Sequence, residues 1–491
     1  MKFSDDQSAA FDAIAEVMRA SGIDLVEESF SPPDEGAAAQ VAAVLGKAGS
    51  GKTALLAKIA DGLHEAGLDL IGGDYEPGRK RTRRSFAVLA PTNKAASVLR
   101  SAGVEATTIH RILYIPVYDP QYELIAKWLS EKGAPKPEVE GVTDEMLDRA
   151  HAFYQTQKSI PGALAAAGLR GSDFIKGWTR RDEALDVALV DEASMLDDKQ
   201  FEDLKEIFST LILFGDPAQL APVGQSGEMI FDKLPEGRRL TLSRIHRQSA
   251  DNPILDLAHA LREGVEFHEF EREIERIAEN DPRVVVAPRA DPDLMARAPM
   301  LCWRNATRIR LIQGFRTAHN APADDLTAGE PLICDGIELP LKHRKKRIDL
   351  EARGLIKGAQ VIYLGAGRKG GFARLHVVGA ETPSISAAAI IKIEAPGLEE
   401  PYIPSAARMG AAFVHGAATT IHKAQGSQWP EVQVFAPDIF AAAQAGRVEA
   451  GAPLWRRLAY VAVTRAQERL IWVTRWRLSK PTTSLGVSDL P

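Results

Sequence analysis

The sequence predicts an α/β protein with two parallel-sheet cores. The first observation is a short apolar run, VAAVL, that leads directly into a glycine-rich loop and then into helix-forming residues. The second is a repeated pattern, an apolar run that ends abruptly in polar residues, at 85–96, 185–195 and 211–224. The third is a later set of strand and helix patterns at 299–316, 417–437 and 456–475. Near-continuous apolar runs are typical of parallel strands that helices cover on both faces.

The composition is that of a globular protein with several domains. Its 491 residues are too many for one hydrophobic core, and 45% of them are hydrophobic and 26% charged. No apolar run reaches the roughly 18 residues needed to cross a bilayer, and the acidic N-terminal stretch does not have the pattern of a signal peptide. Cys302 and Cys334 indicate neither a disulfide framework nor a metal cage. We therefore expect a cytoplasmic protein.

The charge of the chain limits how it would hold a polyanion. A net charge of −6 argues against electrostatic coating of nucleic acid over the whole surface, but it leaves room for a local basic groove. Basic residues gather at 78–84 and 342–347. Taken alone, each run is better interpreted as solvated loop charge.

The loop after the first apolar run has the composition of a phosphate-binding loop. The pattern G-x-x-x-x-G-K-[ST] is matched without a mismatch by Gly46, Gly51, Lys52 and Thr53. The glycines let successive N–H groups point at phosphate oxygens, the lysine reaches the β- and γ-phosphates, and the threonine hydroxyl binds Mg²⁺. Because residues 53–66 are predicted to be helical, the phosphate would lie at a helix N-terminus. A chance glycine turn is the alternative, and the predicted strand and helix around the loop argue against it.

Polar side chains at the ends of three later strands complete a predicted NTPase site. Ligands of parallel sheets bind beyond the carboxyl ends of the strands. The sequence therefore predicts that five side chains converge near the loop lysine, those of Thr92, Asp191, Glu192, Asp216 and Gln219. We expect Asp191 to hold Mg²⁺ and Glu192 to orient or deprotonate the attacking water. The acidic pair could instead cap the next helix, but it ends an apolar run in a chain that already has a phosphate loop.

The second set of strand and helix patterns has no phosphate loop of its own. Such a core suggests a partner that closes over the first core and supplies arginines to the γ-phosphate, an arrangement worth roughly 10³–10⁵ in rate. The candidates are Arg247 in IHRQ and Arg465 in AVTRAQ. For an isolated arginine, a surface salt bridge is the default alternative.

Short motifs in a fixed order give the chain a family resemblance. In sequence order, the Q motif is matched by FSDDQSAAF, motif I by GKAGSGKT, motif Ia by APTNKAA and motif Ib by TTIHRIL. Motif II is matched by DEAS, motif III by GDPAQLAPVG and motif IV by LSRIHRQ. Motif V is matched by TTIHKAQGSQW and motif VI by AYVAVTRA. Together they resemble superfamily 1B DNA helicases, close to the RecD-like and phage Dda-like enzymes. The resemblance runs from residue 3 to about 475, and nine motifs in order make it specific.

The resemblance implies a role for each matched residue. MgATP hydrolysis would depend on Lys52, Thr53, Asp191 and Glu192, and the metal would be held by Thr53 and Asp191. Gln219 would sense the γ-phosphate, which Arg247 and Arg465 would contact. The nucleotide would be bound by Gln7, Gly46, Lys47, Ala48, Gly49, Ser50, Gly51, Lys52, Thr53, Ala54, Asp216 and Gly426. Eight residues would either line the path of single-stranded DNA or couple that path to the nucleotide. They are Thr92, Asn93, Thr108, His110, Asn305, Thr420, His422 and Ser427.

Gln7 has a second interpretation. The resemblance implies that its amide contacts the adenine. The residues SDDQ also form a capping box, with Ser4 at the N-cap and Gln7 at the third helical position.

The resemblance also implies two RecA-like motor domains with an insertion in each. The expected parts are a first motor domain (1–113 and 185–245), a pin-type domain (114–184), a second motor domain (246–325 and 413–480), an SH3-like β-barrel (326–412) and a C-terminal tail (481–491). The first insertion is long, partly helical and rich in aromatic residues, namely Tyr114, Tyr118, Tyr122, Trp128, Tyr154 and Trp178. We expect most of these to pack a local core and one or two to stack on bases, at roughly 1–3 kcal/mol each.

The second insertion is predicted to be rich in strands. Glycine turns and partial alternation of apolar residues occur at 354–380 and 388–397. A small barrel here could be a protein-binding module, but its position between motifs favours a clamp on DNA.

We therefore expect an ATP-dependent DNA helicase with ATP and Mg²⁺ as cofactors. Its partners would be single-stranded DNA and junctions of single-stranded and duplex DNA, with single-strand-binding or recombination proteins as candidates and no membrane. The resemblance implies movement from 5′ to 3′. The alternatives are a DNA-stimulated ATPase subunit of a larger recombination or repair complex, a phosphate-loop ATPase indifferent to DNA and, more weakly, a motor on RNA.

Overall fold

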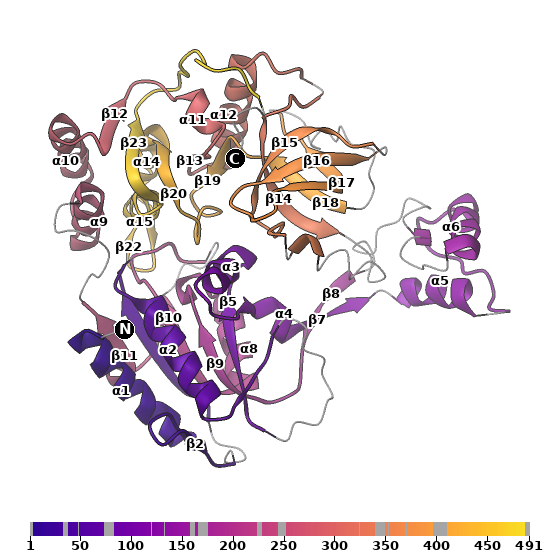
Figure 1. Ribbon diagram of the computed structural model, residues 1–491, viewed down its shortest axis with the longest axis horizontal. Coiled ribbons are helices and arrows are strands. Elements are labelled where there is room, and N and C mark those ends of the chain that lie inside the picture. Colours follow the sequence, from indigo (N-terminus) through magenta and orange to yellow (C-terminus); the bar gives the residue numbers. More distant parts are fainter. Residues whose placement is uncertain are drawn as a thin grey trace.

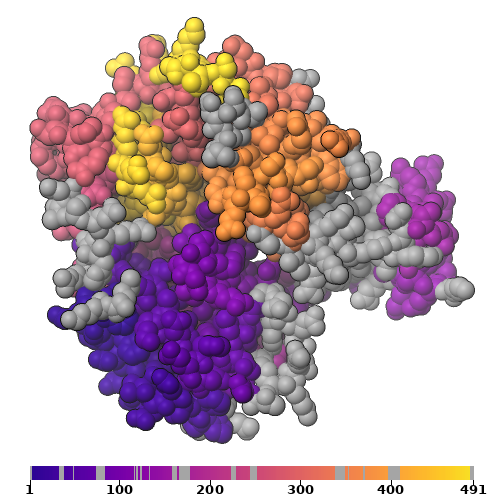
Figure 2. All heavy atoms as spheres, viewed as in Figure 1, coloured from indigo at the N-terminus to yellow at the C-terminus, as the bar shows by residue number. Residues whose placement is uncertain are grey.

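Two parallel sheets, a closed barrel and a small helical module on a two-stranded ribbon make up the protein (Figure 1). The computed structural model describes residues 3–32, 38–47, 49–72, 83–118, 120–131, 133–157, 163–164, 175–222, 228–243, 252–323, 325–338, 349–351, 353–368, 371–395 and 410–486. The basic run 342–347 and most of the run 78–84 lie outside these residues. Among the described helices, none is long and apolar enough to cross a bilayer. In Figure 2 the N-terminal part of the chain meets the C-terminal part along a boundary. We call this boundary between the first and the second core the seam.

The first sheet has the order β11-β3-β10-β9-β5-β4, with β6 beside β5. All of its strand pairs are parallel, as the apolar runs predict. The strand that leads into the phosphate loop, β3, lies between β10 and β11, and Val44 pairs with Phe214. The strands are β3 (Gln40–Gly46), β4 (Asp69–Leu70), β5 (Ser85–Ala90), β6 (Thr107–Thr108), β9 (Leu185–Val190), β10 (Phe208–Gly215) and β11 (Arg239–Leu242).

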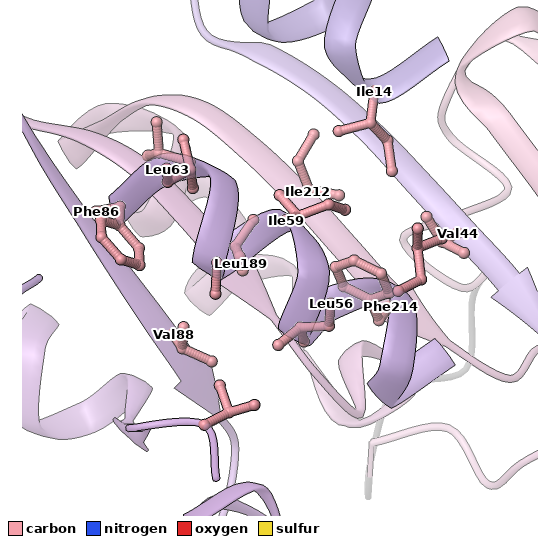
Figure 3. Close-up of a cluster of buried hydrophobic side chains, with 14 of the residues drawn as sticks. Ile14, Val44, Leu56, Ile59, Leu63, Phe86, Val88, Leu189, Ile212 and Phe214 are labelled. Atoms are coloured by element: carbon pink, nitrogen blue, oxygen red, sulfur yellow. The ribbon is translucent and has the colours of Figure 1, made fainter. Parts of the chain in front are cut away.

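Both faces of the first sheet are buried, which explains its continuous apolar runs. One face packs a cluster that includes Ile14, Leu56 and Phe214 (Figure 3). Alternate residues of β3 serve the two faces, Val44 the first and Ala43 the second. The covering helices are α1 (Asp5–Ala20), α2 (Lys52–Glu65) and α3 (Asn93–Ser101) on the first face, and α4 (Ile109–Leu113) and α8 (Asp198–Ile207) on the second.

The second sheet has the order β12-β23-β20-β13-β19 and is also parallel. Its strands are β12 (Val284–Ala287), β13 (Met300–Cys302), β19 (Ala418–Thr420), β20 (Trp429–Phe435) and β23 (Ala466–Val473). One face packs against α9 (Pro253–Glu263), α10 (Phe267–Asn280), α14 (Ala436–Gln444) and α15 (Leu454–Val463). The other packs against α11 (Pro292–Met295) and α12 (Asn305–Ala318). The prediction of two parallel-sheet cores is confirmed.

Five strands close into a barrel between α12 and β19. They are β14 (Pro331–Glu338), β15 (Gln360–Ala366), β16 (Phe372–Val377), β17 (Ser384–Lys392) and β18 (Gly410–His415). The last strand continues to His415, three residues past the expected end of the insertion at 412. The buried carboxylate of Glu330 joins the barrel to α12, because it accepts hydrogen bonds from Arg316 and His415.

The first insertion is a ribbon that carries a helical module. Strands β7 (Tyr114–Tyr118) and β8 (Ile175–Arg180) pair antiparallel, and beyond them lie α5 (Pro120–Ser130) and α6 (Asp144–Gln157). Trp128 and Tyr154 pack against the buried cluster of this module, whereas Trp178 is 48% exposed. The side chains of Tyr118 and Tyr122 lie outside the described part.

Short elements complete the described chain. They are the antiparallel pairs β1 (Ile23–Asp24) with β2 (Ser29–Phe30) and β21 (Val448–Glu449) with β22 (Ala452–Pro453), and the 3-10 turns η2 (Ala193–Met195) and η3 (Glu236–Arg238).

Candidate nucleotide and DNA site

The predicted phosphate loop joins β3 to α2 through two left-handed glycines. Gly49 and Gly51 both have a φ of 83°, which a residue with a Cβ adopts only at a cost. The Nζ of Lys52 donates hydrogen bonds to the carbonyl oxygens of Gly46 (2.8 Å) and Lys47 (2.9 Å). The ammonium therefore lies within the loop, at the N-terminus of α2, where an anion is favoured. The next residues of the predicted set, Thr53 and Ala54, follow in the first turn of α2, while Ala48 lies outside the described part.

Three buried side-chain oxygens in the predicted nucleotide motifs have no hydrogen-bond partner among the described residues. They are Ser50 Oγ, Ser194 Oγ and Gln219 Oε1, in side chains that are 1%, 2% and 5% exposed. A buried polar atom without a partner costs free energy, so each calls for a physical explanation. Ser50 belongs to the phosphate loop, Ser194 follows the acidic pair Asp191 and Glu192, and Gln219 follows β10. A site that binds a polar ligand would give these oxygens their partners.

Asp191 and Glu192 follow β9 and share one electrostatic site with Lys52. Desolvation and the neighbouring Glu192 carboxylate raise the pKa of Asp191 to about 7, and the Lys52 ammonium acts against this rise. A cation bound here would favour the charged form of the carboxylate. The structure thus brings together three residues that lie in two different motifs of the sequence.

Glu192 has an unusual backbone conformation. Its φ of 50° and ψ of 38° lie in the left-handed region, which is uncommon for residues other than glycine. It occupies the N-cap position of η2, yet its side chain makes no capping hydrogen bond. The capping alternative therefore gains no support from this turn. Strained residues of this kind persist where the surrounding structure holds them, frequently at functional sites.

The structure confirms the capping box at Gln7 and also places this residue beside the phosphate loop. The N–H of Ser4 donates to Gln7 Oε1 at 3.0 Å. The Nε2 of Gln7, which is buried, donates to the carbonyl oxygen of Gly51 at 3.4 Å. Gln7 therefore ties α1 to the loop, and its contact with adenine stays a prediction.

Asp216 bonds to the second core with both carboxylate oxygens. Its buried carboxylate accepts a hydrogen bond from Arg262 NH1 at 2.9 Å and another from the Tyr460 hydroxyl. Helix α9, which carries Arg262, also brings His259 near the loop, where burial and then the Lys47 ammonium lower the pKa of the imidazole. The sequence motifs assign Asp216 to the nucleotide and predict none of these partners. The one sequence feature that pointed to a functional role for any of these partners was the position of Tyr460 inside motif VI.

Arg457 of α15 makes a second connection across the seam. Its NH1 donates to the carbonyl oxygens of Pro217 (2.8 Å) and Gln219 (2.5 Å). Leu220 packs in the hydrophobic cluster of the second core, although it follows a strand of the first sheet. The predicted γ-phosphate sensor, Gln219, therefore lies in a loop that both cores hold.

Arg465 lies buried inside the second core. Its Nε, NH1 and NH2 donate, each at 3.0 Å, to the Val461 carbonyl, the Ser427 carbonyl and the Thr464 hydroxyl. Its contact with a γ-phosphate stays a prediction. The other candidate arginine, Arg247, lies outside the described residues.

The first turn of α3 lies where the two cores and the barrel meet. Thr92 caps this helix, since its Oγ1 accepts a hydrogen bond from the N–H of Ala95 at 3.1 Å. A Cβ on Gly426, whose φ is 75°, would lie 3.6 Å from the Cβ of Ala95, and a Cβ on Gly358 of the barrel would lie 3.5 Å from the Cβ of Lys94. Gly426, expected at the nucleotide, is thus placed against motif Ia.

His110 belongs to an aromatic group at the base of the ribbon. Its ring centroid lies 5.1 Å from that of Tyr114 and 4.3 Å, edge-on, from that of Trp178. Burial lowers the pKa of His110, so the ring is neutral at pH 7 and offers stacking and hydrogen bonding rather than charge. Two further predicted residues, Asn93 and Thr108, stand half-buried at the starts of α3 and α4.

Predicted DNA residues of the second core gather at the ends of adjacent strands. Cys302 pairs with Thr420, and these residues end β13 and β19. Thr420 and Asn305, the first residue of α12, therefore lie at the same edge of the sheet. Asn305 Oδ1 accepts a hydrogen bond from Arg308 Nε at 2.8 Å. His422, two residues past Thr420, has a pKa lowered by burial. The last member of the predicted set, Ser427, is buried and bonds Arg465 as described above.

A buried aspartate fixes the start of α12. Asp438 accepts hydrogen bonds from the backbone N–H groups of Trp303 and Arg304 and from the Thr307 hydroxyl, each at 2.9 Å. The Arg304 guanidinium donates to the same carboxylate. No sequence motif predicts this role of Asp438, because its partners lie more than 130 positions away.

A hollow in the described part of the barrel has a basic and aromatic lining. Its volume is about 310 Å³, and Arg368, Phe372, Arg374 and Ser386 line it. Arg374 and Ser386 are neighbours across β16 and β17. Guanidinium groups beside an aromatic ring are suited to phosphates and bases.

Family models match both halves of the chain. Residues 36–281, about half of the chain, match the model described as an AAA domain. Residues 415–473 match the model described as a UvrD-like helicase C-terminal domain. No curated protein sequence matches the chain.

Solved structures of Pif1 helicases are similar along most of the chain. The Pif1 helicase from Candida albicans is 15% identical with a TM-score of 0.48, over 97% of this chain and 95% of that one. The Bacteroides Pif1 helicase in complex with ADP-AlF3 and single-stranded DNA is 14% identical with a TM-score of 0.46, over 96% of this chain and 92% of that one.

Proposed function

The chain belongs to the AAA domain family, and on this premise we propose that it is a superfamily 1B helicase that hydrolyses ATP to move along single-stranded DNA and to separate duplex DNA. One observation carries the proposal. The loop that follows β10, in the same sheet as the phosphate loop, hydrogen-bonds to the second core through Asp216 and Gln219. A motor needs a nucleotide site whose state reaches both of its cores, and this loop provides the connection.

ATP would bind with its phosphates against the loop of residues 46–53. The two left-handed glycines, the Lys52 ammonium and the unpartnered Ser50 hydroxyl fit a phosphate there. Thr53 and Asp191 would hold Mg²⁺, which neutralises phosphate charge when bound. A divalent cation also fits the charge balance, because Asp191 and Glu192 bring two carboxylates together.

Hydrolysis would need residues from both cores. Glu192 would orient or deprotonate the attacking water, and Gln219 would sense the γ-phosphate. Arg465 and Arg247 would contact that phosphate when the cores close. Opening one base-pair step costs roughly 0.6–2.2 kcal/mol, so the supply of energy does not limit the motor, and coupling between the cores does.

Single-stranded DNA would lie across both cores, over the starts of α3 and α12. The meeting of α3 with Gly426 and with the barrel supports this path. The barrel would act as a clamp, for which its hollow with two arginines and Phe372 is suited. Trp178, exposed on the ribbon, would stack on a base at the junction.

Unwinding of duplexes with a single overhang tests the function and the polarity together. By resemblance we propose movement from 5′ to 3′, so a 5′ overhang should support ATP-dependent unwinding and a 3′ overhang should not. The reverse preference would overturn the polarity. ATP turnover stimulated by DNA without unwinding would indicate a subunit of a larger complex, and turnover indifferent to DNA would refute the motor.

A matched pair of lysine variants tests the nucleotide site. Lys52→Ala should abolish ATP turnover and unwinding, because the ammonium that lies within the loop is lost. Lys58→Ala removes an exposed lysine of the same helix and should leave both activities unchanged. DNA-stimulated turnover that persists in Lys52→Ala would refute the assignment.

A further inference from the structure

The loop of residues 216–220 belongs to the first sheet by chain connectivity and to the second core by its contacts. It follows β10 directly. Leu220 is fully buried in the hydrophobic cluster of the second core, and Ala218 packs against the same cluster. The carbonyl oxygen of Leu220 also accepts a hydrogen bond from Gln425 Nε2 at 3.4 Å. A shift of the second core therefore has a direct mechanical route to this loop.

Arg457 holds the loop through backbone atoms. Its buried guanidinium donates to the Pro217 and Gln219 carbonyls on one side and to the Glu449 (2.9 Å) and Ala450 (2.7 Å) carbonyls on the other. All three nitrogens of the guanidinium are used in these four bonds. A lysine at this position has a single nitrogen and could not span both segments.

Asp216 holds the loop through its side chain. Its Oδ1 accepts from Arg262 NH1 at 2.9 Å and from the N–H of Ala218 at 3.1 Å, and its Oδ2 accepts from the Tyr460 hydroxyl. The carboxylate thus shapes the loop internally and joins it to α9 and α15. It is fully buried, so water does not compete for these bonds.

Gln219 sits in the middle of these bonds. Its carbonyl oxygen is held by Arg457, and its N–H donates to the Asp216 carbonyl oxygen at 3.1 Å. Its side-chain Oε1, in contrast, has no partner among the described residues. The main chain is fixed to the second core while the side-chain acceptor remains available to a ligand.

We propose that Arg262, Arg457 and Tyr460 are positioning residues that clasp the loop 216–220 to the second core, so that Gln219 moves with the second core and meets the γ-phosphate only when the cores close. This inference rests on the proposed function, because the role of Gln219 is part of that function. The three residues act through Gln219 and do not touch the nucleotide themselves.

A double-mutant cycle on the rate of ATP hydrolysis tests the clasp. Tyr460→Phe and Gln219→Ala should each lower kcat about tenfold or more, with the KM for ATP changed by less than about threefold. If Tyr460 acts through Gln219, the double variant should be no slower than Gln219→Ala alone. Effects that multiply would overturn the inference, as would a Tyr460→Phe enzyme with full turnover.

Hydrogen exchange in the loop gives a readout that does not depend on turnover. Arg457→Lys should speed exchange of the backbone amides of Asp216 and of residues 218–220, because the bonds across the seam are lost. Arg456→Lys is the matched control, since Arg456 donates to the Gly264 and Val265 carbonyls within the second core, each at 3.0 Å. Equal exchange in the two variants would overturn the inference.

The outcomes separate the clasp from the proposed function. If single-stranded DNA fails to stimulate the native enzyme, the proposed motor fails, and the cycle is then measured on unstimulated ATP hydrolysis. Non-additive rates together with faster loop exchange support the clasp in either case. Additive rates overturn it even if the enzyme unwinds DNA.

Discussion

Removing the Glu330 carboxylate should destabilise the junction between α12 and the barrel far more than the loss of an exposed ion pair. Its Oε2 accepts hydrogen bonds from Arg316 Nε (3.0 Å) and His415 Nε2 (2.8 Å), and its Oε1 accepts from the N–H of Thr327 (2.6 Å). Glu330→Ala would leave the Arg316 guanidinium, only 7% exposed, as a buried charge without its carboxylate. Breaking a buried pair in this way costs about 3–5 kcal/mol.

The same junction should make stability depend on pH. Burial alone would raise the pKa of Glu330, but the hydrogen bond and charge of His415, with Arg316, outweigh it and lower the pKa. A lowered carboxylate pKa contributes stability above the unfolded value of about 4.3, and this is lost as pH falls through the folded value. Burial lowers the pKa of His415 in the folded protein. The contribution of His415 to stability therefore declines once the pH falls below the pKa of about 6.5 that histidine has in the unfolded chain.

Urea unfolding at pH 7, followed by tryptophan fluorescence, measures the effect. Glu431→Ala is the control, because Glu431 pairs with Arg469 at 3.2 Å on the surface, where such pairs contribute about 0–1 kcal/mol. The difference in unfolding free energy between the native protein and Glu330→Ala should narrow only as the pH falls below about 4.3 and through the lower folded pKa of Glu330. A Glu330→Ala protein within about 1 kcal/mol of the native one at pH 7 would refute the reasoning.

Further predictions concern the nucleotide and DNA sites. Glu192→Gln should still bind ATP and DNA but hydrolyse roughly 10²–10⁴-fold more slowly in a single-turnover assay, and full turnover would remove its role. Gly46→Ala should lose binding of a fluorescent ATP analogue, because the new Cβ would lie 2.3 Å from Ser50 Oγ; tight binding would contradict the tight fit. Trp178→Ala should weaken binding to a junction of single-stranded and duplex DNA by roughly 1–3 kcal/mol, and unchanged affinity would argue against stacking. Affinity for single-stranded DNA should fall steeply with salt in a fluorescence titration, whereas a flat response would argue against phosphate contacts.

The sequence predicted those parts of the site that depend on local pattern and on a general rule of sheets. The left-handed glycines of the phosphate loop follow from a short motif. The proximity of Asp191 to Lys52 follows because Asp191 comes directly after β9 and Lys52 ends the loop that follows β3, and the carboxyl ends of parallel strands share an edge. The β-rich character of 354–380 followed from its alternation and glycine turns, and this region lies in the closed barrel.

Contacts between segments that are distant in the sequence were not predicted. Tyr460 bonds Asp216 across 244 positions and Arg457 bonds Gln219 across 238. No periodicity encodes such pairs, because they depend on how two sheets are placed against each other. Gln7 is an intermediate case, since its capping box is local and its bond to Gly51 is not.

The position of β3 in its sheet has a consequence for synthesis of the chain on the ribosome. Both neighbours of this strand, β10 and β11, are encoded much later, from Phe208 onward. At about 5–20 residues per second, the intervening stretch of roughly 160 residues takes roughly 8–30 s to translate. Throughout that interval the apolar strand has no partner on either edge, which is a risk for aggregation. A nascent chain that stalls before Phe208 should therefore be unable to bind ATP and should need a chaperone.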